Sequence, residues 1–130
     1  MAKYASFREL IVWQKGMDLA EAVYRATKMF PAADLYTIGN QLRRSSSSIP
    51  ANIAEGFSRH SRASYRYHIA VALGSQAELQ TQLELARRTS LIGDETTSRL
   101  QALAAEVGRL LNGLWRALSQ RPSAILDVPS

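Results

Sequence analysis

Apolar residues recur at intervals of three and four along most of the chain, which is the spacing that places them on one face of an α-helix. Proline and glycine residues interrupt this pattern at only a few places, and the segments between them predict four helices. Their expected ranges are about 7–30, 34–57, 62–91 and 95–119. No run of alternating apolar and polar residues bounded by turn residues is present, so the sequence predicts an all-α protein.

The first two predicted helices differ in their boundaries and in their regularity. A capping box of Ser6 and Glu9 opens the first helix, and Pro31 stops it. The second helix contains Pro50, which removes one main-chain hydrogen bond and is expected to bend a single helix; two shorter helices are the alternative. The serines at 45–48 are expected to bond strained carbonyls there. The expected apolar stripe of the first helix consists of Leu10, Trp13, Met17, Ala20, Tyr24 and Thr27.

The last two predicted helices are joined by a short turn. Ser61 is expected to cap the third helix, Gly93 to end it in the left-handed conformation, and Asp94 to cap the fourth. Short connections and near-heptad spacing favour a left-handed, antiparallel, up-down-up-down four-helix bundle. We expect the bundle to span residues 1–119, followed by a C-terminal tail at 120–130 that contains the apolar cluster Ala124–Leu126.

The composition fits one compact domain, because 46% of the 130 residues are hydrophobic and 21% are charged. The chain has no cysteine, which excludes disulfides, thiolate metal sites and cysteine nucleophiles. No apolar run approaches the ~20 residues that cross a bilayer. We therefore expect a cytoplasmic protein without a membrane segment.

The residue types that carry enzyme chemistry do not form a recognisable set. His60 and His68 lie eight residues apart, whereas helical metal ligands are usually three or four apart, so we interpret them as partly exposed polar residues. Gly108 and Gly113 have the spacing of a phosphate loop but lack the lysine that follows, and are expected to permit close helix contact. Ser75 is not part of a nucleophile elbow. We expect no enzyme activity, no cofactor and no metal site.

Polar residues form a row along one face of the second predicted helix and a shorter row on the third. If the rows face each other, they form a partly buried hydrogen-bond network that fixes the register of the helices. The alternative is a pair of solvated faces. The rows consist of Gln41, Arg44, Ser48, Asn52, Glu55 and Arg59 on the second helix and of Ser75, Glu78 and Gln82 on the third. The expected network members are Gln41, Ser48, Asn52, Glu55, Ser75 and Glu78.

Several segments together resemble the four-helix-bundle family, which is also called the S23 or 23S rRNA intervening-sequence protein family. They are Phe7–Lys15, Phe30-Pro31, Gln41–Arg44, the block Ser-Ile-Pro-Ala-Asn-Ile-Ala-Glu-Gly at 48–56, and Gly74-Ser75-x-x-Glu78. The resemblance covers about residues 7–115. The chain departs from the family pattern at the serines of 45–47 and at Thr37-Ile38-Gly39.

The resemblance implies an antiparallel four-helix bundle that assembles as a homopentamer, and it implies a role in nucleic-acid binding. The chain is also similar to the accessory protein of diversity-generating retroelements, a basic pentamer that works with a reverse transcriptase and RNA. Neither that retroelement role nor a place as a ribosomal subunit is carried over to this chain.

Positive charge is concentrated in the middle of the chain. Thirteen of the 16 basic residues are arginines, and the net charge is +5. Residues 43–88 hold seven arginines and three acidic residues, and so carry four of these five charges. Arg59, Arg62 and Arg66 flank the start of the third predicted helix, where cations oppose the helix dipole and anions are favoured. The nearby Tyr65 and Tyr67 are candidates for stacking on bases.

Two interpretations of this charge stay open. The first is a non-enzymatic oligomer that binds nucleic acid, either RNA, which we prefer, or DNA. The second is a structural or protein-interaction scaffold that docks an acidic partner protein. Val12, Leu19 and Val23, beside the main stripe of the first helix, provide extra apolar surface for an oligomer. Arg87 and Arg88, at the end of the third helix, are interpreted as structural. The expected nucleic-acid contacts are Arg43, Arg44, Arg59, Arg62 and Arg66.

Overall fold

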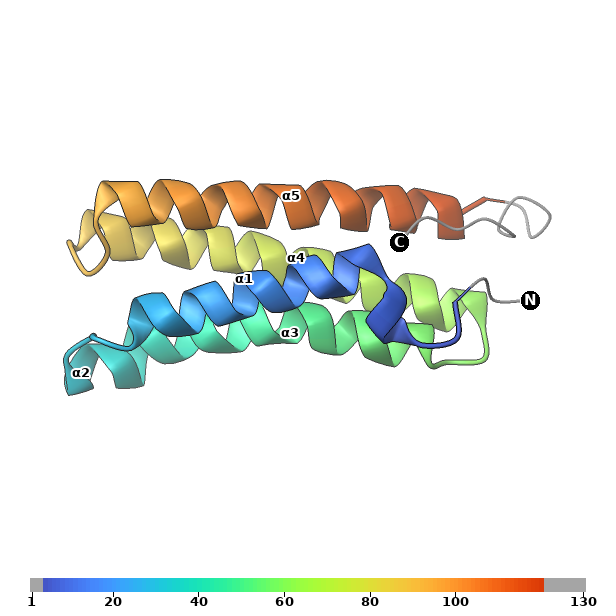
Figure 1. Ribbon diagram of the computed structural model, residues 1–130, viewed down its shortest axis with the longest axis horizontal. Coiled ribbons are helices and arrows are strands. Elements are labelled where there is room, and N and C mark those ends of the chain that lie inside the picture. The colour runs from blue at the N-terminus through green and yellow to red at the C-terminus, as the bar shows by residue number, and fades with distance from the viewer. Residues whose placement is uncertain (1–3, 121–130) are drawn as a thin grey trace.

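A computed structural model of the chain describes residues 4–120 and contains four long helices. The elements, in order, are the 3₁₀ turn η1 (Phe7–Glu9), α1 (Ile11–Thr27), α2 (Ala32–Asp34), the π-helical turn η2 (Leu35–Gly39), α3 (Asn40–Phe57), α4 (Arg62–Arg88) and α5 (Asp94–Leu118). Figure 1 shows the four long helices side by side and alternating in direction. The all-α four-helix bundle expected from the sequence is confirmed. Residues 121–130 of the predicted tail lie outside the described part of the chain.

The first predicted helix is divided into η1 and α1 at Leu10. This residue is extended, with φ −74° and ψ 128°, and its side chain is buried. The capping box is present but belongs to η1: the Glu9 carboxylate accepts from the Ala5 and Ser6 amides at 2.9 and 3.0 Å. The prediction of one helix over 7–30 is therefore too long, because burying Leu10 requires a turn of the backbone before α1.

The core-facing side of α1 is rotated relative to the predicted stripe. Val12, Leu19 and Val23 are fully buried, whereas Met17 and Tyr24 are 44% and 48% exposed. Gly16 is also buried on this side and faces Pro50 of α3, where an added Cβ would lie in ordinary van der Waals contact, 3.5 Å from the Pro50 Cβ. The large apolar side chains that α1 leaves exposed are Met17 and Tyr24 of the predicted stripe and Ile11 outside it.

The helix that contains Pro50 runs without interruption from Asn40 to Phe57. Pro50 is buried against α1, so the alternative of two shorter helices is wrong. Upstream serines bond to main-chain carbonyls as expected: the Ser45 hydroxyl donates to Gln41 at 2.8 Å and the Ser46 hydroxyl donates to Arg43 at 3.1 Å. The proline is thus accommodated inside one helix.

The turn between α4 and α5 differs from the prediction. Ser90, rather than Gly93, adopts the left-handed conformation, with φ 63°. The Ser90 amide donates to the Arg87 carbonyl at 3.0 Å and the Leu91 amide donates to Ala86 at 2.9 Å, which ends α4 in a Schellman motif. Gly93, at φ −73°, precedes α5 and makes Asp94 its first residue instead of its cap. The start of α4 agrees with the prediction, because Ser61 accepts from the Ser64 amide at 3.1 Å.

All four helices contribute to a single core. Two glutamines join α4 to α5 beside it: Gln76 donates to the Ala104 carbonyl at 3.1 Å, and Gln101 donates to the Gln80 carbonyl at 3.0 Å. Every buried side-chain nitrogen or oxygen of the described residues has a hydrogen-bond partner. The large, fully buried side chains are Leu10, Val12, Leu19, Leu42, Ile49, Ile53, Ile69, Leu79, Leu83, Leu100, Leu111 and Leu114.

Candidate functional site

A chain of hydrogen bonds joins the polar faces of α3 and α4. The Ser48 and Ser75 hydroxyl oxygens lie 2.9 Å apart. The Asn52 amide nitrogen donates to the carbonyl and to the hydroxyl of Ser48, at 2.9 and 3.0 Å, and the Asn52 amide oxygen lies 3.1 Å from His68 Nδ1. Ser75 and His68 are buried. The polar rows of the two helices therefore face each other at this level of the bundle, which fixes their relative register.

Glu55 extends this chain toward the surface. One carboxylate oxygen, Oε2, lies 2.6 Å from Arg59 Nη2 and 3.7 Å from His68 Nε2. The hydrogen bond from Arg59, followed by the charge of His68, lowers the pKa of the Glu55 carboxyl. Glu55 is half exposed, so it links the buried part of the network to solvent.

Two of the expected network members lie elsewhere. Glu78 is exposed on α4, and Gln41 is half-buried near the start of α3. Among residues 4–120, neither side chain has a hydrogen bond or an ion pair. The structure therefore brings together Ser48, Asn52, Glu55 and Ser75, but not the two outer positions.

His68 also belongs to this interface, which was not expected from the sequence. It was interpreted as partly exposed, like His60, but only His60 is exposed, and His68 is buried between α3 and α4. His68 precedes Ser75 by seven residues, so both lie on the same face of α4. This heptad relation to a predicted network residue was the available signal.

The adjacent arginines of α3 have different surroundings. Arg43 Nε donates to the Thr27 hydroxyl of α1 at 2.8 Å, and its guanidinium carbon lies 4.5 Å from the centre of the Tyr24 ring. Arg44 is exposed, and within residues 4–120 its side chain has no hydrogen bond or ion pair. Arg43 thus joins two helices, whereas Arg44 is open to solvent.

Arg62 and Arg66 line a hollow where α4 begins and α5 ends. Arg62 Nη1 donates to the Gln120 carbonyl, just beyond α5, at 2.8 Å. In an antiparallel bundle the start of α4 lies beside the end of α5. The dipole of α5 is negative at this end and therefore favours a nearby cation. The sequence-based expectation that the helix dipole disfavours arginines here considered the start of α4 alone and not the adjoining end of α5. The hollow has a volume of about 330 Å³ and is lined by Arg62, Ala63, Arg66, Leu118, Ser119 and Gln120.

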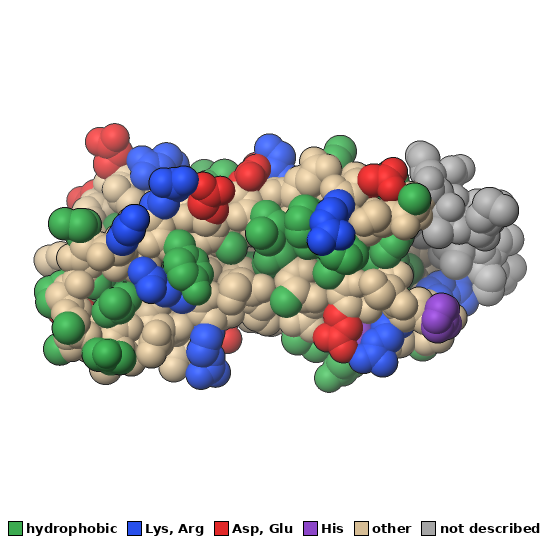
Figure 2. Space-filling view, turned by 60° about the horizontal axis from the view of Figure 1, so that its bottom comes forward, with side chains coloured by type: hydrophobic (Ala, Val, Ile, Leu, Met, Phe, Trp, Pro, Cys, Tyr) green, Lys and Arg blue, Asp and Glu red, His purple; other side chains and the backbone are tan. Residues whose placement is uncertain are grey.

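The basic side chains do not form one continuous surface on the face that Figure 2 shows. Lysine and arginine side chains are spread along it and alternate with acidic and hydrophobic ones. Near the α3–α4 turn, Arg59 pairs with Glu55, Arg62 bonds to the end of α5, and Arg66 is exposed. A ligand phosphate would therefore meet a small group of arginines rather than a broad basic stripe.

The two tyrosines proposed for base stacking differ in exposure. Tyr65 packs edge-on against Phe57, with ring centres 6.1 Å apart, and burial raises the pKa of its phenol above the usual range. Tyr67 is 64% exposed beside Arg66. Of the two rings, only that of Tyr67 lies open for stacking on a base.

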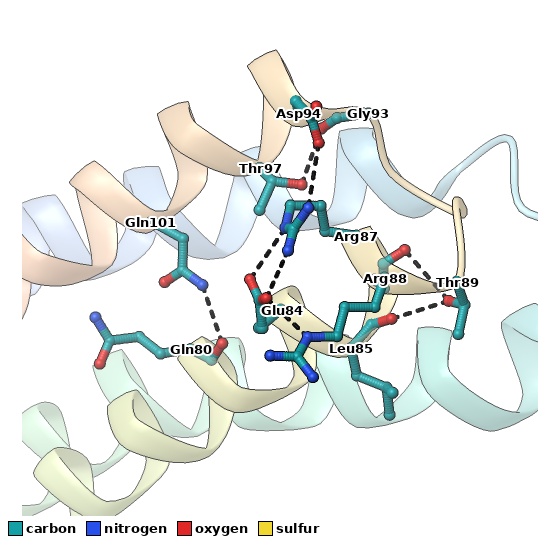
Figure 3. A network of polar contacts seen from close by, with 11 residues as sticks. Gln80, Glu84, Leu85, Arg87, Arg88, Thr89, Gly93, Asp94, Thr97 and Gln101 are labelled. Atoms are coloured by element: carbon teal, nitrogen blue, oxygen red, sulfur yellow. Dashed lines mark hydrogen bonds and ion pairs between the residues drawn. The ribbon is translucent and has the colours of Figure 1, made fainter.

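A group of ion pairs closes the other end of α4 (Figure 3). Glu84 accepts from Arg87 at 2.7 Å and from Arg88 at 3.0 Å, and Arg87 lies 3.6 Å from Asp94 of α5. The hydrogen bonds from these two arginines lower the pKa of Glu84 to about 2. Arg87 and Arg88 are therefore engaged within the protein, as their structural interpretation requires.

Residues 4–120 contain no group of three histidine, cysteine or acidic side chains placed to hold a metal ion. No helix in that range is both long enough and apolar enough to cross a membrane. Three surface hollows formed by residues within 4–120 are open, and no hydrogen bond between a nucleophile and a base is present in any of these three.

Comparison with known proteins identifies a family and a similar solved structure. Residues 8–113 match the model of the 23S rRNA-intervening sequence protein family. The fold is similar to the crystal structure of a protein with unknown function from the S23 ribosomal protein family of Bacteroides thetaiotaomicron VPI-5482. The TM-score is 0.75 at 27% sequence identity, over 82% of this chain and 96% of that chain. No curated protein matches this sequence.

Proposed function

Because the chain belongs to the 23S rRNA-intervening sequence protein family, we propose that it is a non-enzymatic oligomer that binds nucleic acid, with RNA preferred, at the α3–α4 end of the bundle. Members are related by fold and sequence, and the solved relative is itself described as a protein with unknown function. The proposal therefore depends on the residues of this chain.

The main support for the proposal is the hollow that Arg62 and Arg66 line. A guanidinium presents a planar fork of N–H donors that suits two phosphate oxygens. Arg66 is exposed at the hollow, and Arg62 uses one Nη1 hydrogen bond for the Gln120 carbonyl and has further donors. Tyr67 adds an exposed aromatic ring beside Arg66. Together these groups suit a phosphate with an adjoining unpaired base.

The other three predicted arginines have different roles in this proposal. Arg44 and Arg59 are exposed and serve as outlying phosphate contacts. Arg43 is already bonded to Thr27 and stacked on Tyr24, so we assign it to the α1–α3 contact and remove it from the binding surface. An oligomer would repeat the remaining contacts, and each repeat would add to the affinity and to its salt dependence.

Self-association is proposed through the apolar surface of α1. Ile11, Met17 and Tyr24 remain about half exposed after the bundle forms. Hydrophobic side chains gather along the middle of the face shown in Figure 2. Exposed apolar patches of this kind mark protein interfaces. The family resemblance implies that the oligomer is a pentamer, and Met17→Glu should then lower the mass measured by light scattering, whereas Ala102→Glu on α5 should not.

A salt titration of binding to structured RNA tests the nucleic-acid function. Binding should be detectable at low salt, weaken steeply as salt rises, and be largely lost in Arg62→Glu/Arg66→Glu. The matched control is Arg99→Glu/Arg109→Glu, which makes the same charge change at two exposed positions of α5. Equal losses in both double variants, or no binding at low salt, would refute a site at this hollow.

A scaffold that docks an acidic protein is the second candidate. It is favoured by Met29 and Tyr36, which are 88% and 77% exposed on either side of Pro31, and Met29 directly follows Lys28 in the chain. A partner with apolar and acidic residues suits this surface. The scaffold predicts a protein that stays bound after nuclease treatment and is released by Met29→Ser/Tyr36→Ser. Recovery of nucleic acid alone would exclude it.

A further inference from the structure

The hydrogen bonds around Asn52 determine which nitrogen of His68 carries a proton. The Ser48 carbonyl can only accept, so the Asn52 amide nitrogen must face it. The Asn52 amide oxygen then faces His68 Nδ1, and an oxygen can only accept from that nitrogen. His68 Nδ1 is therefore a donor, and in the neutral imidazole Nε2 carries no hydrogen.

This arrangement leaves a neutral His68 with an unfavourable contact. Its Nε2 lies 3.7 Å from Glu55 Oε2, and that same oxygen accepts from Arg59 at 2.6 Å. A proton on Nε2 would turn this contact between two acceptors into an attraction between opposite charges. Two cations would then attract the same carboxylate oxygen.

We infer that proton uptake by His68 draws the Glu55 carboxylate away from Arg59 and frees the Arg59 guanidinium to bind phosphate. This regulation rests on the proposed nucleic-acid function. Glu55 blocks one arginine of the binding surface while it is paired with that arginine, and the protonation state of the buried His68 controls this pairing.

The relative mobility of the three side chains decides which of them moves. His68 is buried, bonded at Nδ1, and packed so closely on α3 that a Cβ at Gly56 would lie 2.8 Å from its own Cβ. Glu55 and Arg59 are each half exposed, so they can change rotamer in solvent. The carboxylate therefore moves to the imidazole, and the guanidinium is released outward.

The other ionisable groups around His68 do not replace it in this role. Glu55 of α3 faces it, and Arg59, two residues beyond the end of α3, pairs with that carboxylate. The lowered pKa of Glu55 keeps the carboxylate charged in the range where an ordinary imidazole changes its charge. On α4, Tyr67 lies edge-on to the imidazole, with ring centres 5.3 Å apart. Tyr65 lies one turn before His68, and burial raises its pKa, so it stays neutral.

Nitrogen-15 NMR of the free protein tests the switch without nucleic acid. In samples at pH 7.5 and 5.5, the neutral form of the His68 ring should carry its proton on Nδ1 only, and the charged form should carry protons on both nitrogens. The Arg59 side-chain signals should sharpen and shift toward those of a free arginine over the same range, and should do so at both pH values in Glu55→Gln. A neutral form with its proton on Nε2, or Arg59 signals that do not change with His68, would overturn the inference.

RNA binding then tests the released arginine. These measurements use a His60→Gln background, because His60 is a second imidazole, exposed next to Arg59. On lowering the pH from 7.5 to 5.5, the slope of log affinity against log salt should steepen by about 0.7–0.9, the value of one added phosphate contact. His68→Gln should abolish this change, and Glu55→Gln should give the steeper slope at both pH values.

These outcomes separate the switch from the function. If His68→Gln retains the full pH dependence of the slope, His68 is not the sensor and the inference is wrong. If no variant binds RNA at low salt, the proposed function fails, while the NMR result still decides whether Glu55 changes partners.

Discussion

Arg43 Nε donates to the buried hydroxyl of Thr27 at 2.8 Å, which joins the first turn of α3 to the end of α1. Thr27 in turn donates to the Val23 carbonyl at 2.9 Å, so its hydroxyl is used in both directions. The guanidinium also lies on the Tyr24 ring. One arginine of the sequence's basic excess is thereby explained by packing rather than by a ligand.

Replacing Arg43 should therefore lower stability in a way that replacing its neighbour does not. Arg43→Ala leaves the Thr27 hydroxyl without this donor and removes the stacking on Tyr24, and should cost about 1–2 kcal/mol of unfolding free energy. Arg44→Ala is the matched control and should stay within about 0.5 kcal/mol. Urea unfolding followed by circular dichroism measures both. Equal effects would show that the contacts of Arg43 with Thr27 and Tyr24 do not contribute to the free energy of unfolding.

Periodicity predicted the bundle because it reports which residues share a face of one helix. The same information could not place the core side of α1, since two apolar stripes lie next to each other there. The choice depends on contacts between helices, such as that of Gly16 with Pro50, which the periodicity of one helix does not contain. Likewise, the role of Arg62 depends on the end of α5 lying beside it, and the sequence of α4 alone does not contain that neighbour.

The candidate site was predicted in the same partial way. Stepwise spacing of polar residues correctly indicated that Ser48, Asn52 and Ser75 share an interface. The same spacing also included Glu78, which is exposed. Glu78 follows Ser75 by three residues, and such a step rotates a side chain far enough around the helix to move it from the interface into solvent. His68 was not expected in the interface because histidine, as a polar residue, was interpreted as partly exposed. Its position seven residues before Ser75 instead places it on the buried face of α4.

The left-handed Ser90 offers a simple test of the α4–α5 turn. At φ 63° a serine carries steric strain that glycine lacks, so Ser90→Gly should raise the unfolding free energy by about 0.5–1 kcal/mol. Gly93, at φ −73° with no atom within 4 Å of an added Cβ, should tolerate Gly93→Ala within about 0.5 kcal/mol. Thermal unfolding distinguishes the two. A large loss in Gly93→Ala would restore Gly93 as the residue that ends α4.

Gly56 should be the glycine least tolerant of a side chain. An added Cβ would lie 2.8 Å from the Cβ of His68 and 3.2 Å from the main-chain oxygen of Tyr65, and neither atom can move without shifting α4. Gly56→Ala should therefore cost about 1–3 kcal/mol. Gly74→Ala is the control, because no atom lies within 4 Å of its added Cβ, and it should stabilise α4 by about 0.5–1 kcal/mol. Similar changes in both variants would contradict the close approach of α3 and α4 at Gly56.

The ion pairs of Glu84 predict how the protein responds to acid. The folded-state pKa of Glu84 is about 2, below the ordinary value of 4.5, because Arg87 and Arg88 both donate to the carboxylate. A lowered pKa means that the folded state holds the charged form more favourably than the unfolded state does. The stabilisation is therefore fully present above pH 4.5 and is lost as the pH falls from 4.5 toward 2.

Glu84→Gln should lower the melting temperature at pH 7, and the difference from the wild type should shrink as the pH falls through that window. Glu78→Gln is the control on the same helix, because Glu78 is exposed and has no ion pair within residues 4–120. Its melting temperature should follow that of the wild type at every pH. Since Glu84 is partly exposed, added salt should reduce the effect at pH 7. A deficit in Glu84→Gln that persists unchanged at pH 2 would assign its role to packing instead of charge.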